Sequence, residues 1–435
     1  MPLSGSPNDT VLDQYLDVTP SLRPKPSDSA YSNQWVLQDL TGNVPKIGGL
    51  IEATDEINGM VYMYAPPETP KKNCSLFVLN TLDMKIQDLS NRLQQRKRRT
   101  SPGNTDPQEK KKFPIIDFPS LAIMKSGSSK FLAVIGGYIY SDEDSEGEAN
   151  SKLFLVDVSD HAQPQWWCQK VEGTAQPRLD ATVIVINNKI YLFGGVDKAH
   201  GPTESPGVQL RSYSILEHDW VGQYWKWEAC DVPYPTKDVA EEINFGYAVP
   251  VSRDNRILLF PSRQAPSFEA TFTSKNIFFF DTQSQTFKLA KITTEEVDLP
   301  QNLSSYYASL FIPPPNNYPP GNNTEYSSFA PQKRRLLFTP ITSPESVLVC
   351  GWRAPLEGGR SMPEIWRFFL FPNDRIICLN VQAADDFRRQ RADFHYFTVI
   401  DRSIYLLGSE DGVDQDDVID IDDKVLDVCL ELSLA

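Results

Sequence analysis

Residues 177–195 read PRLDATVIVINNKIYLFGG, and this stretch decides the fold class. Ala181–Ile186 and Lys189–Phe193 are each predicted to form a strand, because both runs are apolar and rich in β-branched or aromatic side chains. Asn187 and Asn188, which separate the two runs, suit a tight turn that requires positive φ angles. The double glycine at the end lets the chain leave the second strand where a side chain would clash. The stretch therefore predicts an antiparallel hairpin.

Two more strand-like runs, Leu210–Leu216 and Trp225–Val232, follow this hairpin and complete a four-stranded unit. The same order recurs upstream. The strands expected there, and the double glycine, lie in Leu121–Gly137, Lys152–Ser159 and Trp166–Val171. A four-stranded unit that recurs roughly every 40–60 residues is typical of a β-propeller, in which each unit is one blade.

Less regular copies extend the repeat over most of the chain. Two of them keep hairpin-turn residues, Asn58-Gly59 and Asp254-Asn255, between paired strands. We therefore expect an all-β propeller of about six four-stranded blades, with seven possible, in residues 31–435. Residues 1–30 are rich in Pro, Ser and Asp and are expected to be a disordered tail.

The run Gln34–Leu40 is a strand-like segment that precedes the first complete unit. It could complete the last blade and so remove an exposed sheet edge, form an extra edge strand, or be the remnant of a seventh blade. The last blade already offers four strand-like runs of its own. The third of these is predicted at Asp417–Asp422 and the fourth at Val425–Leu432.

Two units carry a more specific motif. In the unit that contains residues 177–195, an aromatic residue, Tyr213, lies on the predicted third strand and Trp225 or Trp227 on the fourth. The corresponding residues of the preceding unit are Gly136, Gly137, Phe154 and Trp166 or Trp167. This order of apolar hairpin, double glycine, aromatic residue and tryptophan resembles the kelch repeat.

The remaining units depart from the motif where its glycines are expected. The residues found there are Ala65-Pro66, Pro261-Ser262 and Ser409. The resemblance implies a kelch-type propeller, a fold that serves mostly as a binding platform. Some relatives, including galactose oxidase, are enzymes, so the resemblance by itself does not assign a function.

Composition and charge restrict the class of partner. The chain has 435 residues, of which 40% are hydrophobic and 23% charged, and its formal net charge is −15. Such a chain can bury a large core, whereas its negative field repels nucleic acids and anionic membranes. No secretory signal or membrane-spanning run is predicted, because the longest apolar stretches, such as Phe131–Tyr140, are short. We expect a cytoplasmic or nuclear protein that is not secreted, with six free cysteines.

The segment 92–112 opposes the sign of the rest of the chain and is expected to be a flexible, solvated loop. Its two basic clusters resemble a bipartite nuclear import signal. The basic residues are Arg96, Lys97, Arg98, Arg99, Lys110, Lys111 and Lys112. Ser101, which precedes a proline beside the arginines, is a candidate phosphorylation site. A plain solvated loop remains the alternative.

Metal sites are weakly indicated. Asp142, Asp144 and Glu146 resemble the start of a calcium loop, but Leu153 occupies the position where an EF-hand needs Glu, so a solvated acidic loop is the alternative. The four histidines have no paired spacing, which argues against a copper oxidase. They are His161, His200, His218 and His395. We expect no cofactor.

No phosphate-binding loop, zinc-protease motif or nucleophile constellation is present in the sequence. We therefore expect a non-catalytic protein-interaction scaffold, a monomer or part of a hetero-complex, whose partners are other proteins. The alternative is a propeller enzyme that acts on a small sugar or metabolite in the central channel. Arg178 and Arg391 precede inner strands and are the candidate partner-facing residues. If these two arginines do not face a partner, they are expected to pair with carboxylates of a neighbouring blade.

Overall fold

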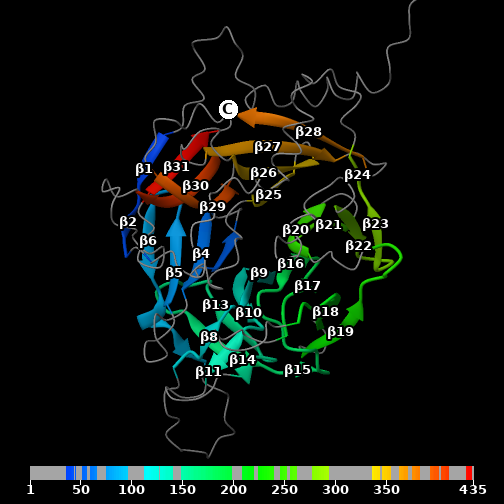
Figure 1. Cartoon of the computed structure of the whole chain (residues 1–435). Helices are drawn as coiled ribbons and strands as arrows, with labels where there is room; N and C mark the ends of the chain where they lie inside the picture. Colours follow the sequence, from blue (N-terminus) through cyan, green and yellow to red (C-terminus); the bar gives the residue numbers. More distant parts are fainter. Residues whose placement is uncertain are drawn as a thin grey trace, which may run out of the picture. The chain divides into compact units, whose positions relative to one another are not determined.

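The computed structural model of the chain, shown in Figure 1, contains strands and turns and one turn of 3-10 helix, η3 (Ser90–Arg92), in the part that it describes. The described residues are 36–43, 45, 51–55, 59–65, 75–96, 112–126, 128–140, 148–197, 208–219, 224–239, 245–251, 255–261, 277–292, 336–342, 345–353, 362–370, 375–382, 392–400, 403–410 and 428–433. The all-β fold class predicted from the sequence is confirmed.

The chain divides into two compact units. The first, here called the N-terminal unit, consists of Asp39–Tyr234 and Asp414–Asp427. The second, the C-terminal unit, consists of Met1–Gln38, Pro235–Val413 and Val428–Ala435. Each unit is described below by itself.

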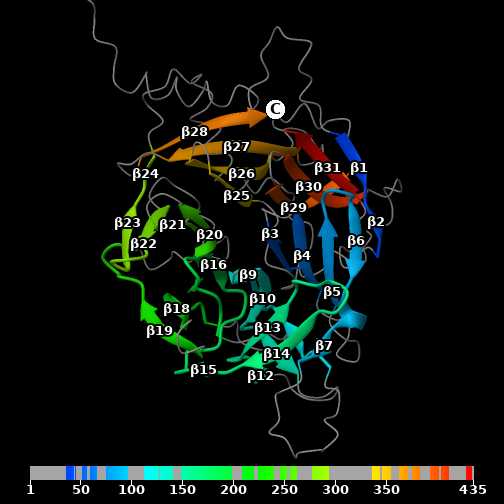
Figure 2. The ribbon, with the colours of Figure 1, turned by 180° about the vertical axis from the view of Figure 1, so that it is seen from behind.

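In its described residues, the N-terminal unit holds three larger sheets and one small one. The first sheet has the order β2-β6-β5-β4-β3, with β2 (Thr41–Gly42), β3 (Ile51–Asp55), β4 (Met60–Ala65), β5 (Ser75–Asn80) and β6 (Lys85–Asp88). The second sheet has the order β7-β14-β13-β10-β9, with β7 (Gln94–Gln95), β9 (Ser120–Ser126), β10 (Ser129–Ile135), β13 (Leu153–Asp157) and β14 (Gln165–Gln169). Of these strands, β3 and β7 are labelled only in the view from behind (Figure 2).

The third sheet has the order β15-β19-β18-β17-β16, with β15 (Val171–Glu172), β16 (Thr182–Ile186), β17 (Lys189–Phe193), β18 (Ser212–Asp219) and β19 (Tyr224–Pro233). The small sheet has the order β12-β11-β8, with β8 (Ile115–Asp117), β11 (Tyr138–Tyr140) and β12 (Glu148–Ala149). The strands β16 and β17 match the hairpin predicted from residues 177–195 to within one residue.

The described part of the C-terminal unit holds three sheets of the same kind. The fourth sheet has the order β20-β21-β22-β23, with β20 (Phe245–Val251), β21 (Arg256–Pro261), β22 (Phe278–Asp281) and β23 (Thr286–Leu289). The fifth has the order β24-β28-β27-β26-β25, with β24 (Lys291–Ile292), β25 (Leu336–Thr342), β26 (Glu345–Arg353), β27 (Met362–Leu370) and β28 (Arg375–Gln382). The sixth has the order β1-β31-β30-β29, with β1 (Val36–Asp39), β29 (Ala392–Ile400), β30 (Ser403–Glu410) and β31 (Val428–Ser433).

The sixth sheet settles where the early strand lies. The segment β1 is the edge strand beside β31, so it completes the sheet that contains the last strands of the chain. Because β31 pairs directly with β30, the run predicted as a fourth strand occupies the third place instead. The third strand predicted at Asp417–Asp422 lies outside the described residues.

The sheets share one plan. Their main strands pair in antiparallel order, and in four sheets a two-residue strand adds in parallel to the outermost of them: β2 on β6, β7 on β14, β15 on β19 and β24 on β28. Within the N-terminal unit, β9 contacts both β3 and β16. Within the C-terminal unit, β25 contacts both β20 and β29. The first antiparallel strands of neighbouring sheets in each unit therefore lie side by side.

The second sheet is buried on both faces. Leu132 and Val134 on β10 pack toward the first sheet, against Tyr64 and its neighbours, whereas Ala133 and Ile135 pack toward the third. Successive side chains on a strand point to opposite faces, so a strand buried on both sides needs an unbroken apolar run. This explains why β10 and β13, the second and third antiparallel strands of the second sheet, carry apolar runs.

Local turn chemistry agrees with the sequence. Asn187 and Asn188 have φ angles of 50° and 62°, as the predicted tight turn requires. A second kind of turn follows β5 and β22, in which the side chains of Asn80 and Asp281 accept hydrogen bonds from backbone N–H groups two residues later, at 3.0 and 2.9 Å. Asp157 forms the same contact after β13, at 3.0 Å. This repeated Asx turn belongs to sheets of both units.

Candidate functional site

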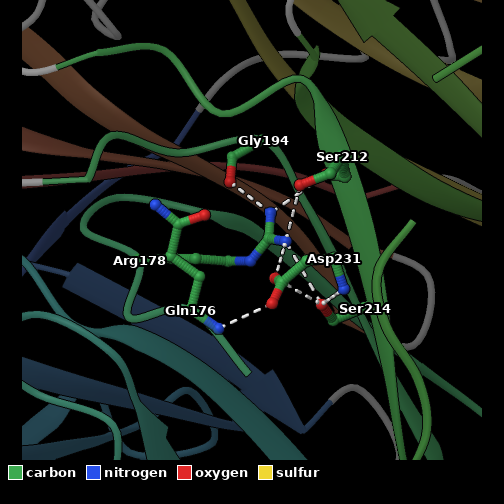
Figure 3. Close-up of polar contacts among 6 residues, drawn as sticks. All are labelled: Gln176, Arg178, Gly194, Ser212, Ser214 and Asp231. Atoms are coloured by element: carbon green, nitrogen blue, oxygen red, sulfur yellow. Dashed lines mark hydrogen bonds and ion pairs between the residues drawn. The ribbon is translucent and has the colours of Figure 1, made fainter. Parts of the chain in front are cut away.

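A buried polar cluster surrounds Arg178, which lies just before β16 in the third sheet (Figure 3). Its side chain is only 2% exposed. Arg178 Nη1 donates to the carbonyl oxygens of Gly194, at 2.9 Å, and Ser212, at 3.0 Å. Arg178 Nη2 donates to Ser212 Oγ at 2.8 Å, to Ser214 Oγ at 3.2 Å and to Asp231 Oδ1 at 2.7 Å. Both terminal nitrogens of the guanidinium are thus satisfied inside the sheet.

Asp231, on β19, balances the charge of this arginine. Its side chain is 30% exposed, and its Oδ2 accepts the backbone N–H of Gln176 at 2.8 Å. Its own backbone N–H donates to Ser214 Oγ at 2.9 Å, while Ser214 Oγ donates to Oδ1 at 3.2 Å. The backbone of Asp231 adopts a φ of 48°, close to irregular pairing between β18 and β19. The irregular strand therefore turns the carboxylate toward Arg178 and the segment before β16.

The double glycine after β17 packs closely against the segment between Arg178 and β16. Gly194 and Gly195 have φ angles of 62° and 90°, and a Cβ on Gly195 would lie 2.7 Å from the carbonyl oxygen of Leu179. The strain expected for this double glycine is confirmed. Ser212 and Ser214 are two residues apart on β18 and therefore face the same side, toward the guanidinium.

These contacts correct the expectation that Arg178 faces a partner. Its side chain is buried, and its carboxylate partner belongs to the same sheet rather than to a neighbouring one. The other candidate, Arg391, lies outside the described residues. Burial also raises the pKa of the nearby Tyr234 phenol far above its ordinary value, with the charge of Arg178 opposing the shift, so Tyr234 stays protonated at neutral pH. The cluster has the chemistry of an internal brace.

The beginning of the basic segment is structured, which corrects the prediction of a flexible loop from residue 92 onward. Gln94 and Gln95 form β7, and the backbone N–H of Arg96 donates to the Trp166 carbonyl at 2.8 Å. The Arg96 guanidinium lies 4.8 Å from the ring centre of Trp167.

Both flanks of the segment pack on the core between the first and second sheets. Leu93 and Phe113 contact this core, and the Phe113 ring meets that of Trp166 edge-on at 5.4 Å. Lys112 is exposed, whereas Lys97, Arg98, Arg99, Ser101, Lys110 and Lys111 lie outside the described residues. The import and phosphorylation predictions for these residues stay predictions.

The structure does not test the calcium prediction, because its three candidate ligands lie outside the described residues. Asp142, Asp144, Glu146 and His200 lie outside the described residues, and of His395 only the backbone, in β29, is described. Across the described ranges, no group of three His, Cys, Asp or Glu side chains could hold a metal ion.

The two remaining histidines have aromatic neighbours. His161 Nε2 lies 2.8 Å from the hydroxyl of the buried Tyr62, and the His218 ring lies 4.9 Å from that of Trp225. Burial and the charge of Lys130 lower the pKa of His161, with Asp160 opposing them, so this imidazole is neutral at pH 7. Through its contact with Tyr62, His161 joins the second sheet to the first.

A surface feature was missed in the sequence. Phe118 and Asp180 each lie two residues before the first main strand of a sheet, and their φ angles are 50° and 54°. The Asp180 N–H donates to the Phe118 carbonyl at 3.0 Å, and Phe118 is 44% exposed. An alignment of the sequences of the second and third sheets on their double glycines and first strands would have shown that Phe118 and Asp180 occupy equivalent positions.

No protein-family model and no curated protein sequence matches this chain. Among the described elements, none is a helix with the length and apolar composition that a membrane crossing requires.

Proposed function

We propose that the chain is a non-catalytic protein-interaction module built as a kelch-type propeller of about six blades. Six sheets of one plan, the side-by-side first strands within each unit and the placement of β1 beside β31 support this architecture. The double glycines of the second and third sheets and the buried aromatic residues that follow them support the kelch type.

The observation that carries the binding function is the exposed Phe118, held in a left-handed backbone conformation on a well-supported sheet end. Left-handed backbone at a bulky residue costs free energy, and strained residues of this kind cluster at functional sites. The buried polar cluster, in contrast, stabilises the third sheet, since its arginine, serines and carboxylate form hydrogen bonds with one another.

Affinity purification of the tagged full chain, followed by quantitative mass spectrometry, tests this function. We expect a small set of proteins to copurify in constant proportion to the chain. Crosslinking at low protein concentration should retain the same set. A chain that purifies alone and instead converts sugars or metabolites would establish the enzyme alternative.

We also propose that the chain resides in the cytoplasm and nucleus, with the basic residues 96–112 as the import signal. Replacing Lys97, Arg98, Arg99, Lys110 and Lys111 by Ala removes charges without touching the structured flanks. A fluorescent fusion of this variant should lose nuclear signal relative to the parent chain. Equal nuclear signal in both would remove the import proposal and leave the binding function unaffected.

A further inference from the structure

His161 makes a polar contact at the border of an apolar junction between two sheets. It lies in the turn between β13 and β14 of the second sheet, whereas Tyr62, on β4 of the first sheet, is fully buried. The imidazole Nε2 lies 2.8 Å from the Tyr62 hydroxyl, and the two rings meet edge-on with their centres 5.7 Å apart. The core that the two sheets share consists of apolar and aromatic side chains. A group that titrates near neutral pH therefore takes part in this junction.

The turn that carries this imidazole is held in place by its own hydrogen bonds. Asp160 Oδ1 accepts the Ala162 N–H at 2.8 Å. Ser159 Oγ accepts the Lys130 N–H at 2.8 Å, which ties the turn to β10. Because the turn restrains His161, an unfavourable charge on the ring is relieved most directly when the two sheets separate locally.

The surroundings of His161 disfavour its charged form. Burial lowers the pKa of the imidazole, the positive charge of Lys130 lowers it further, and Asp160 opposes both. The first sheet presents the Tyr62 hydroxyl to the ring. An imidazolium has an N–H on both ring nitrogens, so it cannot accept a hydrogen bond from this hydroxyl. Charging His161 therefore costs free energy while the junction is closed.

We propose that protonation of His161 loosens the junction between the first and second sheets and makes it sensitive to pH. The neutral imidazole fits the closed junction, whereas the imidazolium is better solvated when the junction opens. A group whose pKa is lowered in the closed state takes up its proton more readily in the open state. The closed junction therefore loses stability as the pH falls below about 6.5, the ordinary value for histidine, and then through the folded-state value.

The same core also holds the flanks of the basic segment. Leu93 and Phe113 both pack against it, so a looser junction weakens the two anchors of residues 92–112. The inference depends neither on the proposed binding function nor on the proposed import signal, because it concerns contacts within the chain alone.

Amide hydrogen exchange of the full chain, measured by mass spectrometry at about pH 7.5 and about pH 5.5, tests the proposal. The rates are corrected for the intrinsic effect of pH on exchange. We expect the corrected exchange of β4 and of residues 158–164 to rise severalfold at the lower pH. Exchange of β17, in the third sheet, should stay nearly constant and serves as the internal reference.

Two histidine variants assign the effect. His161→Gln keeps a side chain that can form a hydrogen bond with Tyr62 but carries no charge, so it should remove the rise. His218→Gln is the matched control, because the His218 ring lies against Trp225 in the third sheet, 4.9 Å between centres. This control should keep the full rise at the junction.

A junction whose corrected exchange is the same at both pH values, or that opens equally in His161→Gln and the parent chain, would overturn the inference. If the Gln variant does not fold, Lys130→Gln replaces it. Removing this cation should reduce the rise at the lower pH, and an undiminished rise would again overturn the inference. Each of these results leaves the proposed binding function standing, since the measurement involves no partner.

Discussion

At the scale of single residues, the second and third sheets depend on backbone positions that only glycine fills at low cost. Gly136 and Gly195 have φ angles of 67° and 90°, and a Cβ on either would lie within 2.7 Å of a backbone oxygen. The first sheet has no such glycine pair. There, the Tyr64 side chain reaches the backbone of Ile116 in the segment before β9. Gly195 approaches Leu179 of its own sheet, whereas Gly136 approaches the Arg178 carbonyl in the third sheet, so Gly136 and Tyr64 each help to join one sheet to the next.

Gly195→Ala should lower the free energy of unfolding by roughly 1–3 kcal/mol, since it adds a clash to an unfavourable φ. Gly173→Ala is the matched control, because Gly173 also has a positive φ, of 84°, but its nearest contact with an added Cβ is an ordinary 3.5 Å. Urea denaturation gives the loss in free energy of unfolding for each variant, and the difference between the two losses measures the clash alone. Equal losses would show that the approach to Leu179 is not tight.

Arg178→Met should destabilise the chain by about 3 kcal/mol, because it removes the cation paired with the Asp231 carboxylate and the hydrogen bonds that the guanidinium donates to two carbonyl oxygens. Lys189→Met removes a cation from the same sheet that also pairs with carboxylates, Glu228 at 2.6 Å and Glu217 at 3.6 Å. Lys189 is about a quarter exposed, so its removal should cost less than about 1 kcal/mol. Thermal unfolding of the two variants side by side checks this, and similar losses would contradict the internal role of Arg178.

At the scale of elements, the repeated Asx turn is the clearest sign that the sheets of both units follow one design. After β5 and β22, a left-handed residue closes a four-residue turn: Met84, with a φ of 52°, and Gln285, with a φ of 53°. Asn80 and Asp281 begin these turns, which shows that either side chain suffices. The sequence signal, an apolar strand that ends in Asn or Asp, was available before the structure.

The turn after β22 also predicts a pH effect. The Ser284 N–H bond to the Asp281 carboxylate, aided by Gln283, lowers the pKa of Asp281 in the folded chain. A lowered pKa stabilises the fold above the unfolded-state pKa, and this contribution disappears as the pH falls through the folded-state value.

Asp281→Asn should therefore resemble the parent chain near neutral pH and lose this part of its acid sensitivity, because Asn80 fills the same place in the first sheet. Asp281→Ala should be weaker by about 1 kcal/mol at neutral pH, since it removes the turn's acceptor. Urea denaturation measured from neutral to acidic pH distinguishes the three chains. An Asn variant with the full acid sensitivity of the parent would assign that sensitivity to other carboxylates.

At the scale of the whole molecule, each unit repeats one sheet plan three times, and the proposed propeller would join all six sheets in one ring. A ring has no terminal repeat with a polar outer face, so a fragment exposes sheet faces that are buried in the whole. We therefore expect residues 31–234 and 235–435, expressed separately, to aggregate, and to become soluble when they are expressed together. Halves that each fold cooperatively as monomers would replace the ring with two independent domains.

By itself the sequence determined the features that depend on neighbouring residues. The hairpin of residues 181–193 with its Asn-Asn turn, the strained glycines and the all-β class follow from backbone preferences and apolar runs, and all are present. Tertiary structure alone decided the rest. Arg178 donates to Asp231, which lies 53 residues later in the chain, and Ser120 donates to Ala181, which lies 61 residues later. The strand β1 lies beside β31, at the other end of the chain. Propensity carries no information about such distant partners, because they are selected by the packing of whole sheets.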